Sequence, residues 1–258
     1  MSYMSALCEE AARSTSDAWA PGRFEVDYLA PEGAVRGAVL EDVWSAPFED
    51  WLPVRRFAAR KGQQHLSGLW WSATTGGHVG FESWLERDHV MLLDFDPAVT
   101  GIASQPFWLR WHDQAGARVS HAPDFFARRA DGSAVVVDCR PSERRGPRDM
   151  AKFEATRQAC ARVGWEYQLV GATDEIVTAN VRWLAGYRHP RHDQLGPADA
   201  LRRAFATAAP LMAGAEAAGD PIAVLPVLFH LLWRHELAAD LSVPLYPGTL
   251  VSPGMVTR

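Results

Sequence analysis

HAPDFFARRADGSAVVVDCR, residues 121–140, is the stretch that decides the fold of this 258-residue chain. It covers most of two runs with strand character, 118–128 and 134–140. Between them, Ala-Asp-Gly at 130–132 is typical of a hairpin turn, because Gly132 can adopt the left-handed conformation at little cost. The stretch therefore predicts an antiparallel hairpin.

The length of the turn sets the register of that hairpin. A three-residue loop at 130–132 pairs Arg129 with Ser133. Counting outward from this pair places Asp124 opposite Asp138, and directly opposed residues of an antiparallel pair point to the same face. A two-residue loop would shift the register by one and send Asp138 to the other face. A site that uses both aspartates requires the three-residue loop.

The hairpin sits within a longer alternation of helices and strands. Apolar residues at helical spacing mark helices, and short apolar runs bounded by turn residues mark strands. The expected order is helix, three strands, helix, strand and helix, over 81–95, 102–111, 118–128, 134–140, 148–163, 165–170 and 173–187. This order predicts an α/β fold with a central sheet flanked by helices.

Composition shifts along the chain predict three segments. Residues 1–75 are rich in Pro, Gly and Trp without sustained periodicity, and we expect an irregular N-terminal region. The α/β elements define a domain over 76–192. Residues 193–258 contain two helical stretches followed by a hairpin, an order that indicates a small winged-helix-like module.

Three acidic residues stand where phosphodiester hydrolysis needs them. Many metal-dependent nucleases hold one or two divalent cations with acidic residues from a helix and from neighbouring strands. Glu86 lies on the first helix, and Asp124 and Asp138 lie on the hairpin. Opposed carboxylates repel unless a cation lies between them, and their oxygens suit Mg²⁺ or Mn²⁺. The sequence thus predicts a metal site; the alternative is that Asp124 is a turn acid and Asp138 a solvated strand end.

Two glutamates compete for the helical position. Glu82 and Glu86 are one turn apart and share a face of the helix. We favour Glu86, because Ser83 and Glu86 form the S-x-x-E pattern with which this class of nuclease usually presents its helical acid. Glu82 is then a salt-bridge partner.

Several motifs in combination resemble a known family. The chain is similar to the TnsA-like endonuclease subunit of heteromeric transposases, of the PD-(D/E)xK nuclease superfamily. The resemblance covers roughly 68–192, continues weakly into the C-terminal module, and is carried by FESWLERDHVMLLDFDP (81–97), QPF (105–107), HAPDF (121–125), VDCRP (137–141) and WLAGY (183–187).

The resemblance implies a restriction-endonuclease-like core and Mg²⁺-dependent nicking at transposon 5′ ends. It also implies a separate transposase subunit that cuts and joins the 3′ ends, and an AAA+ ATPase that regulates both. Carried over by position, Glu86, Asp124 and Asp138 are metal ligands. Arg140 occupies the place that the family usually gives to lysine.

That arginine departs from the family pattern. Arginine stays protonated in proteins and cannot accept a proton from water. It can hold the scissile phosphate through paired hydrogen bonds, so we expect Arg140 to clamp phosphate while metal activates the water. Lys152, one helix later, is a spatial substitute for the missing lysine, but a solvated helix lysine explains it better. The departure also leaves a second hypothesis, a non-catalytic assembly factor that bridges transposase and ATPase.

Charge separates DNA contact from protein contact along the chain. The whole sequence carries a net charge of −5, which argues against binding nucleic acid by bulk electrostatics. Arginines gather beside the predicted site, however, and we expect DNA contacts from Arg144, Arg145, Arg148 and Lys152. The C-terminal module is close to neutral, which favours a protein partner there.

The remaining features of the sequence indicate where in the cell the protein is expected. Uninterrupted apolar runs stay short of the ~18 residues that a membrane span needs, and no export signal is visible after Met1. The 3 cysteines fit neither a disulfide framework nor a zinc site. We expect a reduced, cytoplasmic protein. A host-defence or repair nuclease is a third hypothesis, which the absence of a neighbouring transposase gene would favour.

Overall fold

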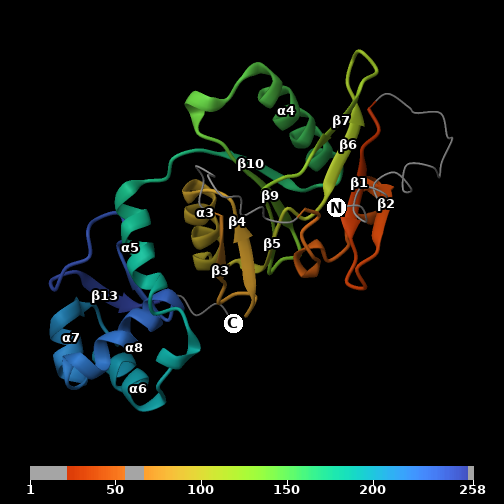
Figure 1. Ribbon diagram of the computed structural model, residues 1–258. Coiled ribbons are helices and arrows are strands. Elements are labelled where there is room, and N and C mark those ends of the chain that lie inside the picture. Colours follow the sequence, from red (N-terminus) through yellow and green to blue (C-terminus); the bar gives the residue numbers. More distant parts are fainter. Residues whose placement is uncertain (1–21, 56–66, 255–258) are drawn as a thin grey trace. The chain divides into compact units, whose positions relative to one another are not determined.

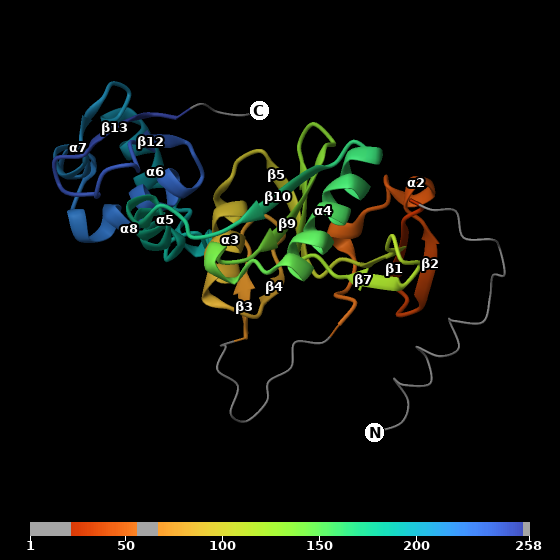
Figure 2. The same cartoon turned by 90° about the horizontal axis from the view of Figure 1, so that it is seen from above.

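The computed structural model describes residues 22–55 and 67–254, and their contacts group into two compact units (Figures 1 and 2). The first unit combines the described residues before Gly68 with Gly101–Gly171. The second combines Gly68–Thr100 with the described residues from Ala172 onward. The chain therefore crosses between the units more than once, and each unit is assembled from separate parts of the sequence.

The predicted hairpin forms with the predicted register. Strands β8 (Phe125–Arg129) and β9 (Ala134–Cys139) are antiparallel, with Phe125 opposite Val137. The Arg129 N–H donates to the carbonyl of Ser133 at 2.9 Å, which closes the three-residue loop. Gly132 has φ +84°, so the left-handed conformation that the turn requires is present.

One side of the hairpin is extended by a strand–helix–strand crossover. Strand β10 (Glu166–Val170) pairs parallel to β9, and helix α4 (Pro147–Arg162) connects the two. Helix α4 buries Phe153, Ala159 and Cys160, and packs along β10. Every residue of β9 is buried, as expected of a strand covered on both faces. With β5 (Val99–Ser104) at the other edge, the sheet order is β10-β9-β8-β5.

A second sheet of the first unit is antiparallel, in the order β2-β1-β6-β7. Strands β1 and β6 alternate between a core face and an open face, and the core residues of the sheet pack with those of α4 and the β8–β9 hairpin. The strands are β1 (Glu25–Leu29), β2 (Val35–Val39), β6 (Trp108–His112) and β7 (Arg118–His121), with α2 (Leu40–Val43) and η2 (Phe48–Asp50) after β2.

Two strands predicted as continuous are each divided between the two sheets. The predicted strand 102–111 becomes β5 and β6, and the predicted strand 118–128 becomes β7 and β8. Each break contains a proline, Pro106 or Pro123, which cannot donate a ladder hydrogen bond. At the first break Gln105 also has φ +46°, so the chain turns sharply there. Both breaks mark points where the chain leaves one sheet and enters the other.

The N-terminal region is more regular than its composition suggests. Strands β1 and β2 and the short helix α2 all lie within the segment expected to be irregular. Val26 and Tyr28 alternate with more exposed residues in β1, and this alternation over five residues was too short to stand out among Pro and Gly. The part of the predicted segment from 56 to 66 lies outside the described residues.

The second unit combines a hairpin, an amphipathic helix and the C-terminal elements. Strands β3 (Gly68–Trp71) and β4 (His78–Phe81) precede α3 (Trp84–Phe95), which packs against α5 (Glu175–Ala185). A single core joins Met91 of α3 and Val181 of α5 to the C-terminal helices. These contacts do not follow the predicted boundaries at 75 and 192, because the apolar faces of α3 and α5 pack on the module. The division of the chain into three segments stays a prediction.

The C-terminal elements follow the order helix, strand, two helices and two strands. The short strands form a sheet in the order β11-β13-β12. The first of the two helices predicted for this region is shorter than expected, and a short strand and another helix follow it. The elements are α6 (Leu195–Ala204), β11 (Ala209–Pro210), α7 (Leu211–Ala218), α8 (Pro221–Trp233), β12 (Leu237–Ala239) and β13 (Leu250–Pro253). The winged-helix classification stays a prediction.

Within the described ranges, no single helix is long and apolar enough to cross a membrane. Helices α7 and α8 meet the length and composition criteria only together, and the chain bends by 119° between them.

Candidate active site

Asp124 and Asp138 face each other at the open end of the β8–β9 hairpin. The last paired residues are Phe125 and Val137, and one step further along the same register Asp124 lies opposite Asp138. Asp124 immediately precedes β8, and Asp138 is the penultimate residue of β9. The opposition that the sequence predicted from the turn is therefore confirmed at the level of strand register.

Asp138 is buried and held by two side chains. The residue is 1% exposed, which corrects the alternative of a solvated strand end. Its carboxylate accepts hydrogen bonds from His121 Nε2 at 2.8 and 3.0 Å and from the Tyr167 hydroxyl at 2.7 Å. A carboxylate only accepts, so Nε2 carries the hydrogen in this contact. Burying an ionised carboxylate is costly without such partners, and these two donors offset that cost.

The charge of Asp138 changes the pKa of two neighbouring groups. Burial, and then the charge and hydrogen bond of Asp138, raise the pKa of the Tyr167 phenol above its ordinary value. Burial, and then the same charge, raise the pKa of the Cys160 thiol to about 12. Both groups therefore keep their protons at neutral pH, and the pocket around Asp138 contains no second anion from either of them.

Asp124 closes the end of β9. Its Oδ2 accepts the backbone N–H of Cys139 at 2.7 Å, in the position where a ladder carbonyl would otherwise lie. Its own carbonyl accepts the N–H of Gln105 at 2.9 Å. Asp124 is therefore fixed from both sides, by the strand that it faces and by the turn that ends β5.

Arg140 extends toward helix α4. Its Nη2 lies 3.0 Å from Asp149 Oδ2, and its Nε donates to the carbonyl of Arg144 at 3.2 Å. The side chain is 43% exposed. Exposed pairs of this kind contribute about 0–1 kcal/mol, so exchanging Asp149 for a phosphate would cost little.

Glu86 belongs to the second unit, where it forms a capping box. Ser83 is the N-cap of α3 and its Oγ accepts the Glu86 N–H at 3.1 Å. In return, Glu86 Oε2 accepts the N–H of Glu82 at 2.7 Å and Oε1 accepts the Ser83 hydroxyl at 2.8 Å. The S-x-x-E pattern has a structural role of its own, since it satisfies the Glu86 N–H, which the first helical turn leaves unpaired, and the Glu82 N–H just before the helix.

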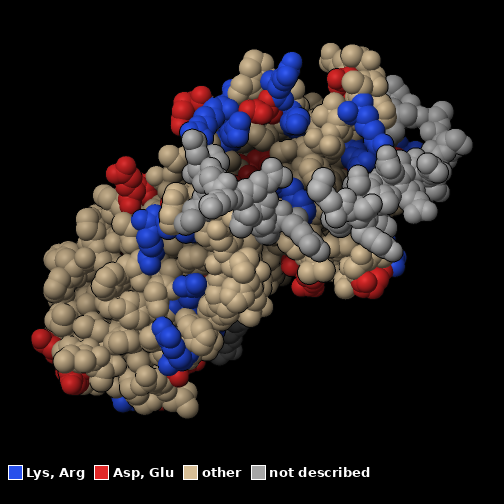
Figure 3. All heavy atoms as spheres, viewed as in Figure 1, with Lys and Arg blue, Asp and Glu red and all other residues tan. Residues whose placement is uncertain are grey.

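The predicted DNA-contact residues lie in the loop after β9 and on α4. Arg144 and Arg148 are exposed, and Lys152 is partly buried. Arg145 instead donates its Nε to the carbonyl of Arg140 at 3.0 Å and braces the loop. Figure 3 shows basic and acidic side chains side by side in this part of the surface. The charge of the loop is therefore mixed.

The comparison with protein families matches this part of the chain. The model for the TnsA-like endonuclease N-terminal domain matches residues 96–171. The predicted resemblance is confirmed there. The matched TnsA-like segment contains Asp124, Asp138 and Arg140, whereas Glu86 precedes it. No curated protein matches the chain.

The donors of the TnsA-like segment suit a hard cation in their chemistry. Asp124 and Asp138 offer carboxylate oxygens, the ligands that Mg²⁺ prefers, and they are opposed in register. Within 22–55 and 67–254, no three His, Cys, Asp or Glu side chains are grouped as a metal site. The segment thus supplies two of the three predicted ligands, and the third, Glu86, comes from the second unit.

Sequence reasoning missed the two partners of Asp138. His121 stands in the HAPDF motif, three residues before Asp124, but the motif alone assigns it no role. Tyr167 lies in β10, 29 residues after Asp138, in a strand whose pattern carries no sign of a polar contact. The parallel pairing of β9 with β10 brings Tyr167 onto the face of Asp138, and this pairing is a tertiary feature.

Proposed function

We propose that the chain is the DNA-cleaving subunit of a heteromeric transposase, which hydrolyses a phosphodiester at the transposon 5′ ends with Mg²⁺, or with Mn²⁺ in its place. The observation that carries the proposal is the opposition of Asp124 and Asp138 inside the TnsA-like segment. A pair of carboxylates in this register is electrostatically unfavourable unless a cation or a proton donor accompanies it.

Each residue has a distinct task in this proposal. Asp124 and Asp138 would hold Mg²⁺, and Glu86 stays the predicted helical ligand. The bound metal supplies an activated water and neutralises charge on the leaving oxygen. Arg140 exchanges its contact with Asp149 for the scissile phosphate, which it clamps through two parallel hydrogen bonds. Arg144, Arg148 and Lys152 contact the flanking backbone.

His121 and Tyr167 position Asp138 in this scheme. Their donors approach the carboxylate from two sides, so the carboxylate cannot rotate freely about its Cβ. A ligand held in one orientation loses less conformational freedom when it binds a metal. Both residues act through Asp138, so we assign them as positioning residues.

We propose that the C-terminal module, as a winged-helix-like fold, contacts the transposase subunit or an AAA+ ATPase. Helix α8 would be the groove-reading helix of such a fold, yet its sequence PIAVLPVLFHLLW contains no Arg or Lys. Ile222 on this helix is 86% exposed. An apolar helix without cations suits a protein partner better than a DNA groove.

The test is nicking of transposon-end DNA with Mg²⁺ in the presence of the neighbouring gene products. We expect Asp124→Ala to abolish nicking, and Asp193→Ala, which removes an exposed carboxylate outside the site, to leave it intact. A charge-removing variant that keeps the shape, Asp124→Asn, should also abolish nicking while it preserves the fold. Full nicking by Asp124→Asn would contradict the assignment of metal ligands.

The second candidate function is a non-catalytic assembly factor that bridges transposase and ATPase. It is favoured by the full set of internal partners at Asp138 and by the Arg140–Asp149 pair in place of a lysine. Excision in the complete system separates the two candidates. Unchanged excision by the double variant Asp124→Ala, Asp138→Ala would establish the assembly role, and lost excision with retained complex formation would reject it.

A further inference from the structure

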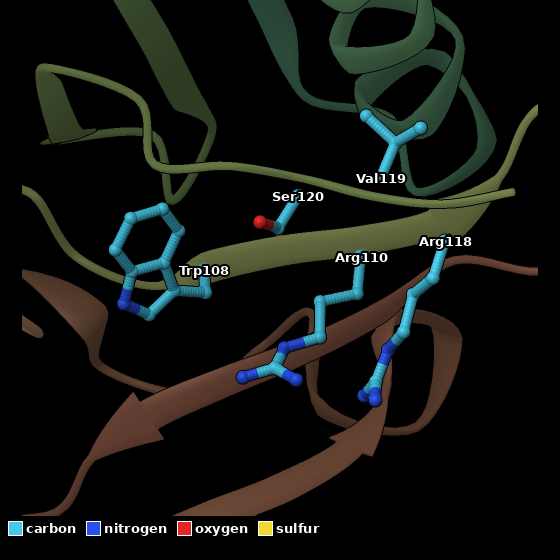
Figure 4. Close-up of a pocket in the computed structure, with 5 residues that line it drawn as sticks. All are labelled: Trp108, Arg110, Arg118, Val119 and Ser120. Carbon is cyan, nitrogen blue, oxygen red and sulfur yellow. The ribbon is translucent and has the colours of Figure 1, made fainter. Parts of the chain in front are cut away.

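The open face of the second sheet of the first unit carries a pocket that the proposed catalysis does not use. In β6, Leu109 and Trp111 point into the core, so the residues between and before them point outward. Arg110 pairs with Ser120 across the sheet, which places Ser120 of β7 on the same open face. The pocket is lined by Trp108, Arg110, Arg118, Val119 and Ser120, and we call it the β6–β7 pocket (Figure 4).

The guanidinium groups of Arg110 and Arg118 are the hydrogen-bond donors at the β6–β7 pocket. Figure 4 shows Arg110 and Arg118 extending in the same direction from neighbouring strands. The Arg118 side chain is exposed and forms no hydrogen bond or ion pair with the residues that the structure describes, although its charge acts on Asp27. Arg110 pairs through Nη2 with Asp27, while its Nε is buried without an acceptor. The buried Nε is closed to a ligand, so the donors that Arg110 can offer are those of its terminal nitrogens.

The arginines on this face outnumber its acidic residues. Asp27 and Glu25 of β1 lie opposite Trp108 and Arg110. Burial raises the pKa of Asp27, whereas the charges of Arg110 and Arg118 lower it. Glu25 is 3.9 Å from Arg23. Three arginines therefore stand against two carboxylates, and the cation left without a close partner is Arg118.

We propose that the β6–β7 pocket binds a phosphate of the DNA backbone. Arg118 and the terminal nitrogens of Arg110 donate to the phosphate oxygens, the Ser120 hydroxyl donates a further hydrogen bond, and the Trp108 ring packs against the adjoining sugar. Guanidinium groups suit phosphate because their planar N–H donors match two oxygens at once. The proposal rests on the proposed function, since DNA is the substrate that supplies the phosphate.

The position of β7 links this pocket to the candidate active site. β7 is the edge strand of its sheet, and successive residues of a strand point to opposite faces. Ser120 lines the pocket on one face, and the next residue, His121, contacts Asp138 on the other. A DNA backbone held at the pocket therefore lies at the sheet edge that also carries the positioning residue of the site.

The experiment measures binding of the full chain to a labelled DNA duplex by fluorescence anisotropy over a range of salt concentrations. Loss of one phosphate contact lowers the magnitude of the slope of log K against log salt by about 0.9, so a variant that matches the wild type at 1 M salt binds DNA about eightfold more weakly than the wild type at 0.1 M salt. We expect this loss for Arg118→Ala and a largely restored slope for Arg118→Lys. The matched control is Arg36→Ala, on β2 of the same sheet, which removes an exposed arginine paired with Glu32.

The outcomes separate this proposal from the proposed function. Because the Arg118 side chain is exposed and forms no hydrogen bond or ion pair with the described residues, Arg118→Ala should melt close to the wild-type temperature. If the wild type binds and nicks DNA while Arg118→Ala and Arg36→Ala show equal affinities and slopes, the pocket does not bind phosphate and the nuclease assignment stands. If the wild-type chain neither binds nor nicks DNA with its partners, both proposals fail.

Discussion

Replacing Tyr167 by phenylalanine tests the buried contact on which the candidate site depends. The substitution removes one hydroxyl and leaves the ring, so the packing of β10 is retained. The lost hydrogen bond is 2.7 Å long and ends on the buried carboxylate of Asp138. Hydrogen bonds to charged groups contribute about 1.5–3 kcal/mol, and His121 keeps both of its contacts. We therefore expect Tyr167→Phe to lower the free energy of unfolding by about 1.5–3 kcal/mol at neutral pH.

The assay is urea unfolding at pH 7, followed by circular dichroism, with Tyr28→Phe as the control. Tyr28 is a buried tyrosine of the same unit that stacks on Trp51 and has no hydroxyl contact to a buried charge among the described residues. Its phenylalanine variant should stay within about 0.5 kcal/mol of the wild type. Equal stabilities of Tyr167→Phe and Tyr28→Phe would refute the reasoning, because the Tyr167 hydroxyl would then contribute nothing to holding Asp138.

Three further predictions follow from single groups. Burial raises the pKa of the Cys160 thiol from its ordinary value of 9.0 to about 12. The free energy of unfolding is therefore unaffected by this group below pH 9 and falls by up to about 4 kcal/mol as the pH rises to 12. Cys160→Ala should flatten this alkaline decline in urea titrations at stepped pH. Gly132→Ala should cost about 1 kcal/mol or more in the same assay at pH 7, because φ is +84° there. Ser83→Ala should cost about 1 kcal/mol by removing the N-cap of α3; an unchanged unfolding midpoint would show that Glu86 closes the helix alone.

The hairpin and its two possible registers could be predicted from the sequence because local turn chemistry determines them. The sequence left a two-residue and a three-residue loop open; the structure has the three-residue loop, and this length sets every pair outward to Asp124 and Asp138. The crossover through α4 and β10 was equally accessible, since both elements have strong periodic patterns and clear ends. These features need no knowledge of distant parts of the chain.

The division of strands between two sheets could not be predicted in the same way. Residues 102–111 and 118–128 were each predicted as one strand that continues through Pro106 or Pro123, because strand-favouring residues lie on both sides of each proline. Only the tertiary arrangement shows that each run changes sheets at its proline. The same change of sheet brings His121 to Asp138, 17 residues away, so the missed break and the missed positioning residue have a single cause.

The candidate site residues also have structural roles, and this limits what alanine substitutions can reveal. Asp124 caps the Cys139 N–H, Glu86 completes the capping box of α3, and Arg140 ties the loop to α4. An alanine at any of these positions removes a local hydrogen bond together with any catalytic group, so lost activity alone identifies neither.

Amide substitutions separate the two roles at Asp124 but not at Asp138. Asparagine at 124 can still accept the Cys139 N–H through its carbonyl oxygen, so the strand end is retained while the charge is lost. His121 Nε2 contacts both oxygens of Asp138, so asparagine at 138 places an amide NH2 against this N–H, and two donors then face each other in a buried position. A stable but inactive Asp124→Asn variant therefore reports on metal and DNA chemistry, whereas Asp138→Asn reports mainly on the buried contact that holds the carboxylate in place.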